Sequence, residues 1–345
     1  MIASGIGIRK LRNLMARMLC EVGVDPADAE AVAWVYATMT LRGVGHHDVS
    51  GFPGLLGRLQ GNVYNVRPDI RIVREHEAVA VMDGDNAPGP LAAYRATEAA
   101  IGKAGRFGIG MVSVRNSNHF MGAAPYALLA AERGMLGIVA SNTMSCMGAP
   151  GCNDWVIGNN PWGFGVDTGG GFPLLLDICN AYASYGKLHE YKARGERIPR
   201  EWGVDAQGRP TTSAARVLDG GTPMPMAGHK GFGIALLVEL LTGVLSGGAV
   251  TDEVSLEPEE GNGSSQAAIV IDVRRFMPAR QFRRRTRQMV EHIRSHTPID
   301  PQAPIALPGE RSQRARRAMQ NEGVRLSEGT VRALNEWARR LGIRA

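Results

Sequence analysis

Apolar side chains recur every three or four residues along much of the chain, which is the spacing of helices that bury one face. Near the start, Ile8, Leu11, Leu14 and Met18 follow this spacing. After an Asp-Pro turn, a favourable helix start, the pattern returns over residues 27–41. Further helices are predicted at residues 91–107, 127–133, 182–191, 234–245, 281–295, 311–321 and 327–341.

Short runs of apolar residues, bounded by glycine or by charged turns, predict strands between these helices. Residues 70–83 form two alternating strands around a turn at 75–77. The other expected strands are residues 108–114, 135–140, 174–178 and 268–273. Strands interspersed with helices indicate an α/β protein.

Composition agrees with a compact, turn-rich α/β enzyme. The 345 residues are 44% hydrophobic and include 44 glycines, enough for one large unit or two interleaved lobes. No stretch has the length and apolarity of a signal peptide or membrane span, so we expect a cytoplasmic protein with no membrane partner. The four cysteines lack CxxC spacing, which predicts neither a zinc site nor disulfides.

The net charge of +6 is concentrated in an arginine-rich stretch, residues 274–317. Two interpretations of this stretch are a nucleic-acid surface and a solvated helical face that also attracts anionic ligands. There is no recognisable nucleic-acid motif, and few aromatic residues stand between the arginines to stack on bases. The second interpretation is therefore favoured, and no nucleic-acid partner is expected.

Polar residues 115–119, RNSNH, directly follow the predicted strand at 108–114. In parallel α/β sheets, ligands bind outside the carboxyl ends of the strands, so this cluster is a candidate active centre. The alternative is a helix start in which Ser117 or Asn118 is the N-cap.

Three adjacent residues, His46, His47 and Asp48, suggest a second polar centre. Neighbouring side chains on a helix or strand diverge, so the three are poorly placed to hold one metal ion, and no metal is expected. A role for one of these three residues as a catalytic acid or base fits this spacing better than a metal site does. A polar surface turn is the alternative.

Two further features bear on cofactor binding. Asp177, near the end of a buried strand, is able to orient a ribose hydroxyl or a catalytic histidine, or to cap the helix predicted at 182–191. Residues 228–233, GHKGFG, place glycines and Lys230 at a helix start, a plausible phosphate-binding arrangement. It is not a Walker loop, because no Ser or Thr follows the lysine.

Several of these stretches together resemble the malate/lactate dehydrogenase type 2 oxidoreductases, whose relatives include 2,3-diketo-gulonate reductase and ureidoglycolate dehydrogenase. The resemblance covers nearly all of the chain. Its most specific parts are VRNSNHF at 114–120, GNNP at 158–161, LLLDICN at 174–180, YGK at 185–187, the WG-x-D-x-x-G-x-PTT pattern at 202–212, GHKGFG at 228–233 and LPGE at 307–310.

The resemblance implies an α/β fold that is not of the Rossmann type but similar to sulfolactate dehydrogenase, with a central mixed sheet flanked by helices. It implies a helical lobe made from both ends of the chain, residues 1–68 and 279–345. Residues 69–278 would then form the α/β region that binds cofactor and substrate. It also implies a homodimer.

The implied activity is hydride transfer between NAD or NADP and a small 2-oxo or 2-hydroxy acid. The family's Ser-His-Gly motif falls on residues 46–48, which makes His47 the implied proton donor or acceptor, with His119 as the second catalytic histidine. A histidine, with an ordinary pKa near 6.5, suits proton transfer near neutral pH. Asn118 and Arg115 are the implied substrate-binding residues. Implied cofactor contacts are Ser141, Asp177, Ile178, Cys179, Asn180, His229, Lys230, Gly309 and Glu310.

The chain departs from the family pattern around His47. Gly45, His46 and Asp48 replace the usual Asp, Ser and Gly, and Gly51 replaces an arginine that would clamp a substrate carboxylate. Two hypotheses follow: an active 2-oxo-acid reductase, or a catalytically silent relative that still binds a dinucleotide. The intact motifs at 114–120 and 228–233 favour the enzyme. Without the arginine, simple 2-oxo acids are expected to bind weakly unless another cation, such as Arg115 or Lys187, replaces it.

Overall fold

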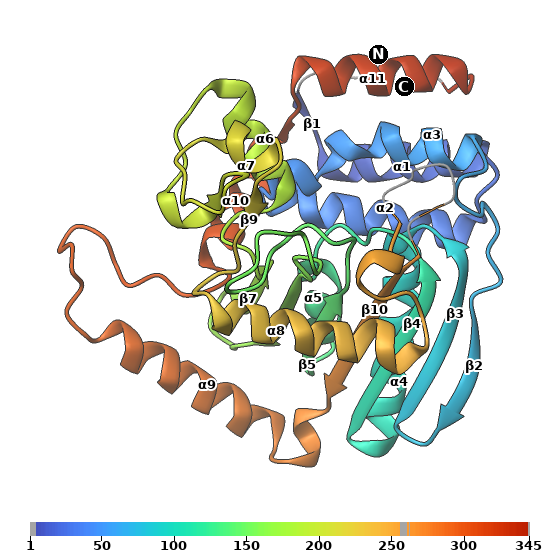
Figure 1. Ribbon diagram of the computed structural model, residues 1–345. Coiled ribbons are helices and arrows are strands. Elements are labelled where there is room, and N and C mark those ends of the chain that lie inside the picture. Colours follow the sequence, from blue (N-terminus) through green and yellow to red (C-terminus); the bar gives the residue numbers. More distant parts are fainter. Residues whose placement is uncertain (1–4, 256–260, 262, 344–345) are drawn as a thin grey trace.

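The computed structural model describes residues 5–255, 261 and 263–343, with His46 described by its backbone alone. Its centre is a seven-stranded sheet in the order β2-β3-β4-β10-β5-β6-β7 (Figure 1). The β3–β4 pair is parallel, and the other neighbours in this sheet are antiparallel, so the expected mixed sheet is confirmed. The strands are β2 (Arg71–His76), β3 (Val79–Ala87), β4 (Ile109–Ser117), β5 (Leu136–Ser141), β6 (Trp162–Asp167), β7 (Pro173–Ile178) and β10 (Ser264–Ile271).

Helices cover both faces of this sheet. α4 (Gly89–Phe107) and α5 (Ala124–Glu132) pack on one face, and α8 (His229–Glu239), extended by the π-helical turn η4 (Leu240–Val244), lies over the other (Figure 1). Glycines in the strands allow α4 and α5 to approach the sheet closely. A Cβ at Gly110 would lie 2.2 Å from the Ala100 carbonyl oxygen, and one at Gly165 would lie 2.6 Å from that of Ala127.

Helices from the two ends of the chain lie together. α1 (Ile8–Glu21), α2 (Pro26–Leu41) and α3 (Phe52–Gln60) form one group, and α11 (Glu328–Arg340) lies along it (Figure 1). β1 (Gly5–Ile6) pairs with β11 (Val324–Arg325), which ties the two ends together. α9 (Ala279–Arg294), from the C-terminal part of the chain, does not join this group. It packs Val290 with Val166 and Leu174 of the sheet. The division into residues 1–68 with 279–345 and residues 69–278 stays a prediction.

The remaining elements form the segments beside the sheet. They are α6 (Tyr185–Arg194), α7 (Ala214–Leu218), α10 (Glu310–Glu322), the pair β8 (Gly203–Val204) and β9 (Thr222–Pro223), and the short 3-10 turns η1 (Gly45–His47), η2 (Val49–Gly51), η3 (Arg200–Trp202), η5 (Thr251–Glu253) and η6 (Val273–Arg275).

Most elements fall near their predicted positions, and two differences have clear physical causes. β6, with the sequence WGFGVD, was not predicted, because its two glycines break the apolar pattern. β4 continues to Ser117, so the polar residues after 114 begin inside a strand. The proposed caps at Ser117 and Asn118 are therefore wrong: the next helix, α5, begins at Ala124.

Candidate active site

A cavity of about 900 Å³ lies where several chain segments meet beside β7. Its wall includes residues that follow α2, β4 and β5, much of β7, the start of α6, and the start of α10. Among the residues implied by the family resemblance, it brings together His47, His119, Asp177, Ile178, Cys179 and Gly309. We call this space the main cavity.

His47 and His119 face each other in the main cavity. Their ring centroids are 5.1 Å apart, and the ring planes meet at 60°. His47 ends η1, and the next turn is fixed on both sides: Asp48 Oδ1 accepts a hydrogen bond from the Ser50 N–H at 2.8 Å, and the Val49 N–H donates to Thr40 Oγ1 at 3.0 Å. The short turn therefore holds the histidine in place without a helix around it.

His119 owes its position to its neighbour Asn118, which is fully buried. Asn118 Nδ2 donates to Asn86 Oδ1 at 2.8 Å and to the Ala87 carbonyl at 2.9 Å. Gly89 packs directly against this segment, because a Cβ there would lie 2.1 Å from the Asn118 carbonyl oxygen. Asn118 is not among the residues that line the main cavity. Its contacts are those of a residue that anchors the segment.

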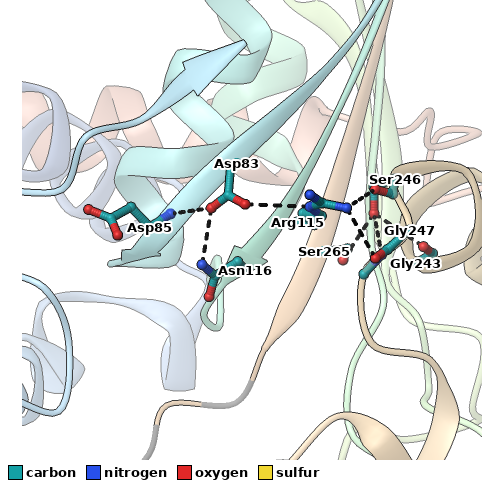
Figure 2. Close-up of polar contacts among 9 residues, drawn as sticks. Asp83, Asp85, Arg115, Asn116, Gly243, Ser246, Gly247 and Ser265 are labelled. Carbon is teal, nitrogen blue, oxygen red and sulfur yellow. Dashed lines mark hydrogen bonds and ion pairs between the residues drawn. The ribbon is translucent and has the colours of Figure 1, made fainter. Parts of the chain in front are cut away.

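Arg115 also points elsewhere (Figure 2). Its Nε lies 3.5 Å from Asp83 Oδ2, and its Nη1 donates to the carbonyls of Ser246 and Gly247 at 3.2 and 3.4 Å. The same Asp83 accepts a hydrogen bond from Asn116. Arg115 thus joins β3 and β4 to the segment after η4 and does not line the main cavity, which leaves it without contact to the implied substrate site.

Asp177 lies partly buried near the end of β7 and caps a helix. Its two carboxylate oxygens accept hydrogen bonds from the N–H groups of Ala123 and Ala124 at 3.1 and 3.0 Å, at the start of α5. The alternative that it caps the helix at 182–191 is wrong, because Ser184 caps α6 by accepting from the Lys187 N–H. Burial raises the pKa of Asp177 to about 6, and the two backbone hydrogen bonds lower it only in part.

The other implied cofactor residues do not line the main cavity. Ser141 is buried and donates to the carbonyls of Asn142 and Ser265. His229 and Lys230 are exposed at the start of α8, and Glu310 binds Arg294 and the Leu307 N–H.

Asn180 connects the segment before α8 to the cavity wall. Its carbonyl accepts from the Met226 N–H at 2.7 Å, and its Nδ2 donates to the Asn160 carbonyl at 2.6 Å. Its Oδ1 is buried and has no hydrogen-bond partner among the described residues. The hydrogen bond from Met226 therefore holds the chain just before the GHKGFG segment against Asn180, the last residue of the LLLDICN segment. Asn180 directly follows Cys179, which lines the main cavity.

Three cations in the cavity wall were not among the predicted site residues: Arg42, Lys187 and Arg311. Lys187, a possible substitute for the missing arginine, lies at the start of α6 with its Nζ 3.3 Å from Glu190 Oε2. The YGK and LPGE motifs were the available signals for Lys187 and Arg311.

At Gly51, where the family has an arginine, a Cβ would meet no heavy atom within 4 Å, so the site of the absent arginine is open space.

Within the described residues, no cluster of three or more His, Cys, Asp or Glu side chains is arranged to hold a metal ion. Among the described helices, none combines the length and apolarity needed to cross a bilayer.

Comparison with known proteins identifies the family to which this chain belongs. The model of the malate/L-lactate dehydrogenase family matches residues 6–335. The chain belongs to this family. Members of the malate/L-lactate dehydrogenase family are NAD(P)-dependent oxidoreductases of 2-hydroxy and 2-oxo acids, and the implied enzyme class is therefore confirmed at that level.

Relatives within the malate/L-lactate dehydrogenase family carry different names. A malate dehydrogenase of Pyrococcus horikoshii is 33% identical over 97% of this chain and 94% of its own length. A 2,3-diketo-L-gulonate reductase of Mannheimia succiniciproducens is 28% identical over 88% of this chain and 91% of its own. The structure of the Methanocaldococcus jannaschii sulfolactate dehydrogenase superposes with a TM-score of 0.91 at 31% identity, covering 98% of each chain, which confirms the expected fold.

Proposed function

We propose that the chain reduces a small 2-oxo acid, or oxidises the matching 2-hydroxy acid, with NAD(P)H or NAD(P)⁺ and with His47 as the acid or base. The observation that carries this proposal is the placement of the His47 and His119 rings edge-on to each other, 5.1 Å apart, in a cavity of about 900 Å³. That volume falls in the range of sites that enclose small molecules and cofactors.

The residues present fit a dinucleotide. The start of α10 reaches the main cavity at Gly309, and this helix has no side-chain cap, so its first N–H groups suit a phosphate. Arg311 adds a cation there, and the charge of Glu310 is offset by Arg294. Gly309 has a φ of +99°, and a Cβ would lie 2.3 Å from the Pro173 carbonyl oxygen, so a larger residue would push this loop off β7.

Proton transfer is the part of the reaction that falls to the protein. When bound, the nicotinamide supplies or accepts the hydride. Reduction leaves negative charge on the substrate oxygen, and an imidazolium at His47 is suited to donate the proton that neutralises it. In the reverse direction, neutral His47 accepts the hydroxyl proton. His119, with its ring next to that of His47, is suited to hold the same oxygen.

The glycine at position 51 affects which substrates we expect the protein to bind. A bidentate arginine would add two charge-assisted hydrogen bonds to a substrate carboxylate, worth about 1.5–3 kcal/mol each when buried. Arg115 does not line the main cavity, which leaves Lys187 and Arg311 among the candidate replacements. We expect simple 2-oxo acids such as pyruvate or oxaloacetate to bind weakly, and a bulkier or less acidic carbonyl compound to be favoured; small 2-oxo acids, diketo sugar acids and cyclic imino acids are the compounds to screen.

A steady-state screen of these compounds with NADH and NADPH tests the proposal, with Gly51→Arg beside the parent chain. The variant should lower the KM for pyruvate or oxaloacetate by about tenfold or more, since it restores at least one strong hydrogen bond. Gly54→Arg, on the next turn, is the matched control and should change nothing. Parent KM values for these acids well below a millimolar would contradict the weak-binding expectation. Cofactor binding without turnover of any compound would favour the silent relative.

The homodimer is part of the proposal. Leu236, Leu237, Leu240, Val244 and Leu245, on α8 and its π-helical continuation, are each about half exposed. A continuous apolar surface of this kind marks an interaction site more often than a free surface. Light scattering should give twice the 37.0 kDa chain mass, and Leu240→Glu should shift the protein toward the monomer. A parent chain that stays at 37.0 kDa at working concentration would rule out the dimer.

A further inference from the structure

A second, smaller cavity of about 160 Å³ lies between α1, α2, α5 and α10. Its wall contains four arginines, Arg9, Arg12, Arg42 and Arg316, and one carboxylate, Glu132. The arginines come from three different helices, so the tertiary structure alone brings them together. We call this space the arginine cavity.

Positive charge in the arginine cavity exceeds negative charge. Arg12 pairs with Glu30, through Nη2 and Oε2 at 2.7 Å, but its Nε is buried and has no partner among the described residues. Arg9 and Arg316 form no ion pair within the described part of the chain. Four guanidinium groups therefore stand against two carboxylates, Glu30 and Glu132, an excess of two positive charges.

Arg42 is the most unusual member of this set. It is 2% exposed, and its Nη1 donates to Ser312 Oγ at 3.3 Å, but Nε and Nη2 have no partner among the described residues. Burial, and then the charge of Arg316, lower the pKa of Arg42 to about 10. Buried polar groups in folded proteins are nearly always paired, and a buried charge without a partner is costly. An anion beside Arg42 would remove this cost.

We propose that the arginine cavity binds a small free oxyanion with two negative charges, of the class of inorganic phosphate or sulfate. Guanidinium groups bind such oxygens with pairs of parallel hydrogen bonds. Arginines that approach from α1, α2 and α10 suit a tetrahedral ion, which presents oxygens in several directions, better than a planar carboxylate. Two charges on the ion match the excess of two that remains when Glu30, the partner of Arg12 outside the wall, is counted with Glu132.

The site is separate from the proposed catalytic site, although Arg42 lines both cavities. Arg316 lines only the arginine cavity and Arg311 only the main cavity, so the two sites are distinguishable by substitution on one helix. Arg314 lies between them in sequence on α10, is exposed, and lines neither, which makes it the matched control.

Isothermal titration calorimetry of the full chain with inorganic phosphate, in chloride buffer at constant ionic strength, tests the proposal. The parent chain should bind phosphate at a saturable site, sulfate similarly, and acetate more weakly. Arg316→Gln should weaken phosphate binding by about tenfold or more, because one charge-assisted partner is lost. Arg314→Gln should bind as the parent does, and Arg311→Gln, which changes only the main cavity, should keep the saturable phosphate site that Arg316→Gln weakens.

Glu132→Gln provides a test that misfolding cannot imitate. Removing the carboxylate from the wall should tighten phosphate binding several-fold, since a repelling charge is gone. The proposal is overturned if the parent shows no saturable binding, or if acetate binds as tightly as phosphate. It is also overturned if Arg311→Gln abolishes binding while Arg316→Gln keeps it, because the ion would then occupy the main cavity.

Discussion

His47→Ala should lower turnover by about 100-fold or more while cofactor binding survives. General acid–base catalysis contributes roughly 10² to 10⁴ in rate, and the substitution removes the proposed proton donor. The ring of His47 packs edge-on to that of His119 in the main cavity, while the first N–H groups of α10, proposed to hold the cofactor, belong to another part of the wall. The loss should therefore fall on the rate constant kcat and leave the dissociation constant of NAD(P)H nearly unchanged.

The measurement is a pair of experiments on one set of variants: steady-state kinetics, and fluorescence titration with NADH and NADPH. His76→Ala is the matched control, because His76 is exposed on the edge strand β2 and does not line the main cavity. The pH profile adds a second readout, since the limb that reports the proton donor should disappear with His47. Turnover equal to that of the parent would assign proton transfer to another group, with His119→Ala as the next variant to measure.

Asp177→Asn should change how stability depends on pH. The pKa of Asp177 is raised from 3.8 to about 6, so the folded state holds this proton more tightly than the unfolded state. The stabilisation is fully present below about pH 4 and is lost as the pH rises to about 6. By linkage, a difference of about two pH units corresponds to about 3 kcal/mol. Asparagine keeps an acceptor for one of the two N–H groups but cannot ionise.

Urea unfolding of parent and variant between pH 4 and pH 7 measures this effect. The free energy of unfolding of the parent, minus that of Asp177→Asn, should fall by about 3 kcal/mol across the interval, because only the parent must bury the carboxylate charge. Asp154→Asn, at an exposed position, is the control and should give a constant difference. Parallel curves for the parent and Asp177→Asn would show that Asp177 titrates in its ordinary range.

The sequence by itself determined most of the local structure. Helices such as α4 and α11 depend on periodic burial, and strands such as β5 and β7 on short apolar runs, and both features are visible in the order of residues. The set of short motifs was specific enough to predict the family, and family membership carried the mixed sheet with it. β6 was missed because its glycines are placed for contact with α5, a reason that lies outside the strand itself.

Only the tertiary structure decided what each polar residue contacts. Arg115 and His119 are four residues apart, yet one binds Asp83 across the sheet and the other lines the main cavity, because a strand ends between them. Asp177 caps α5, a helix more than forty residues earlier in the chain, and no local pattern records such a pairing. Arg42 and Arg316 lie in one cavity for the same reason: hydrophobic packing sets the helices side by side, and long-range proximity is a property of that packing.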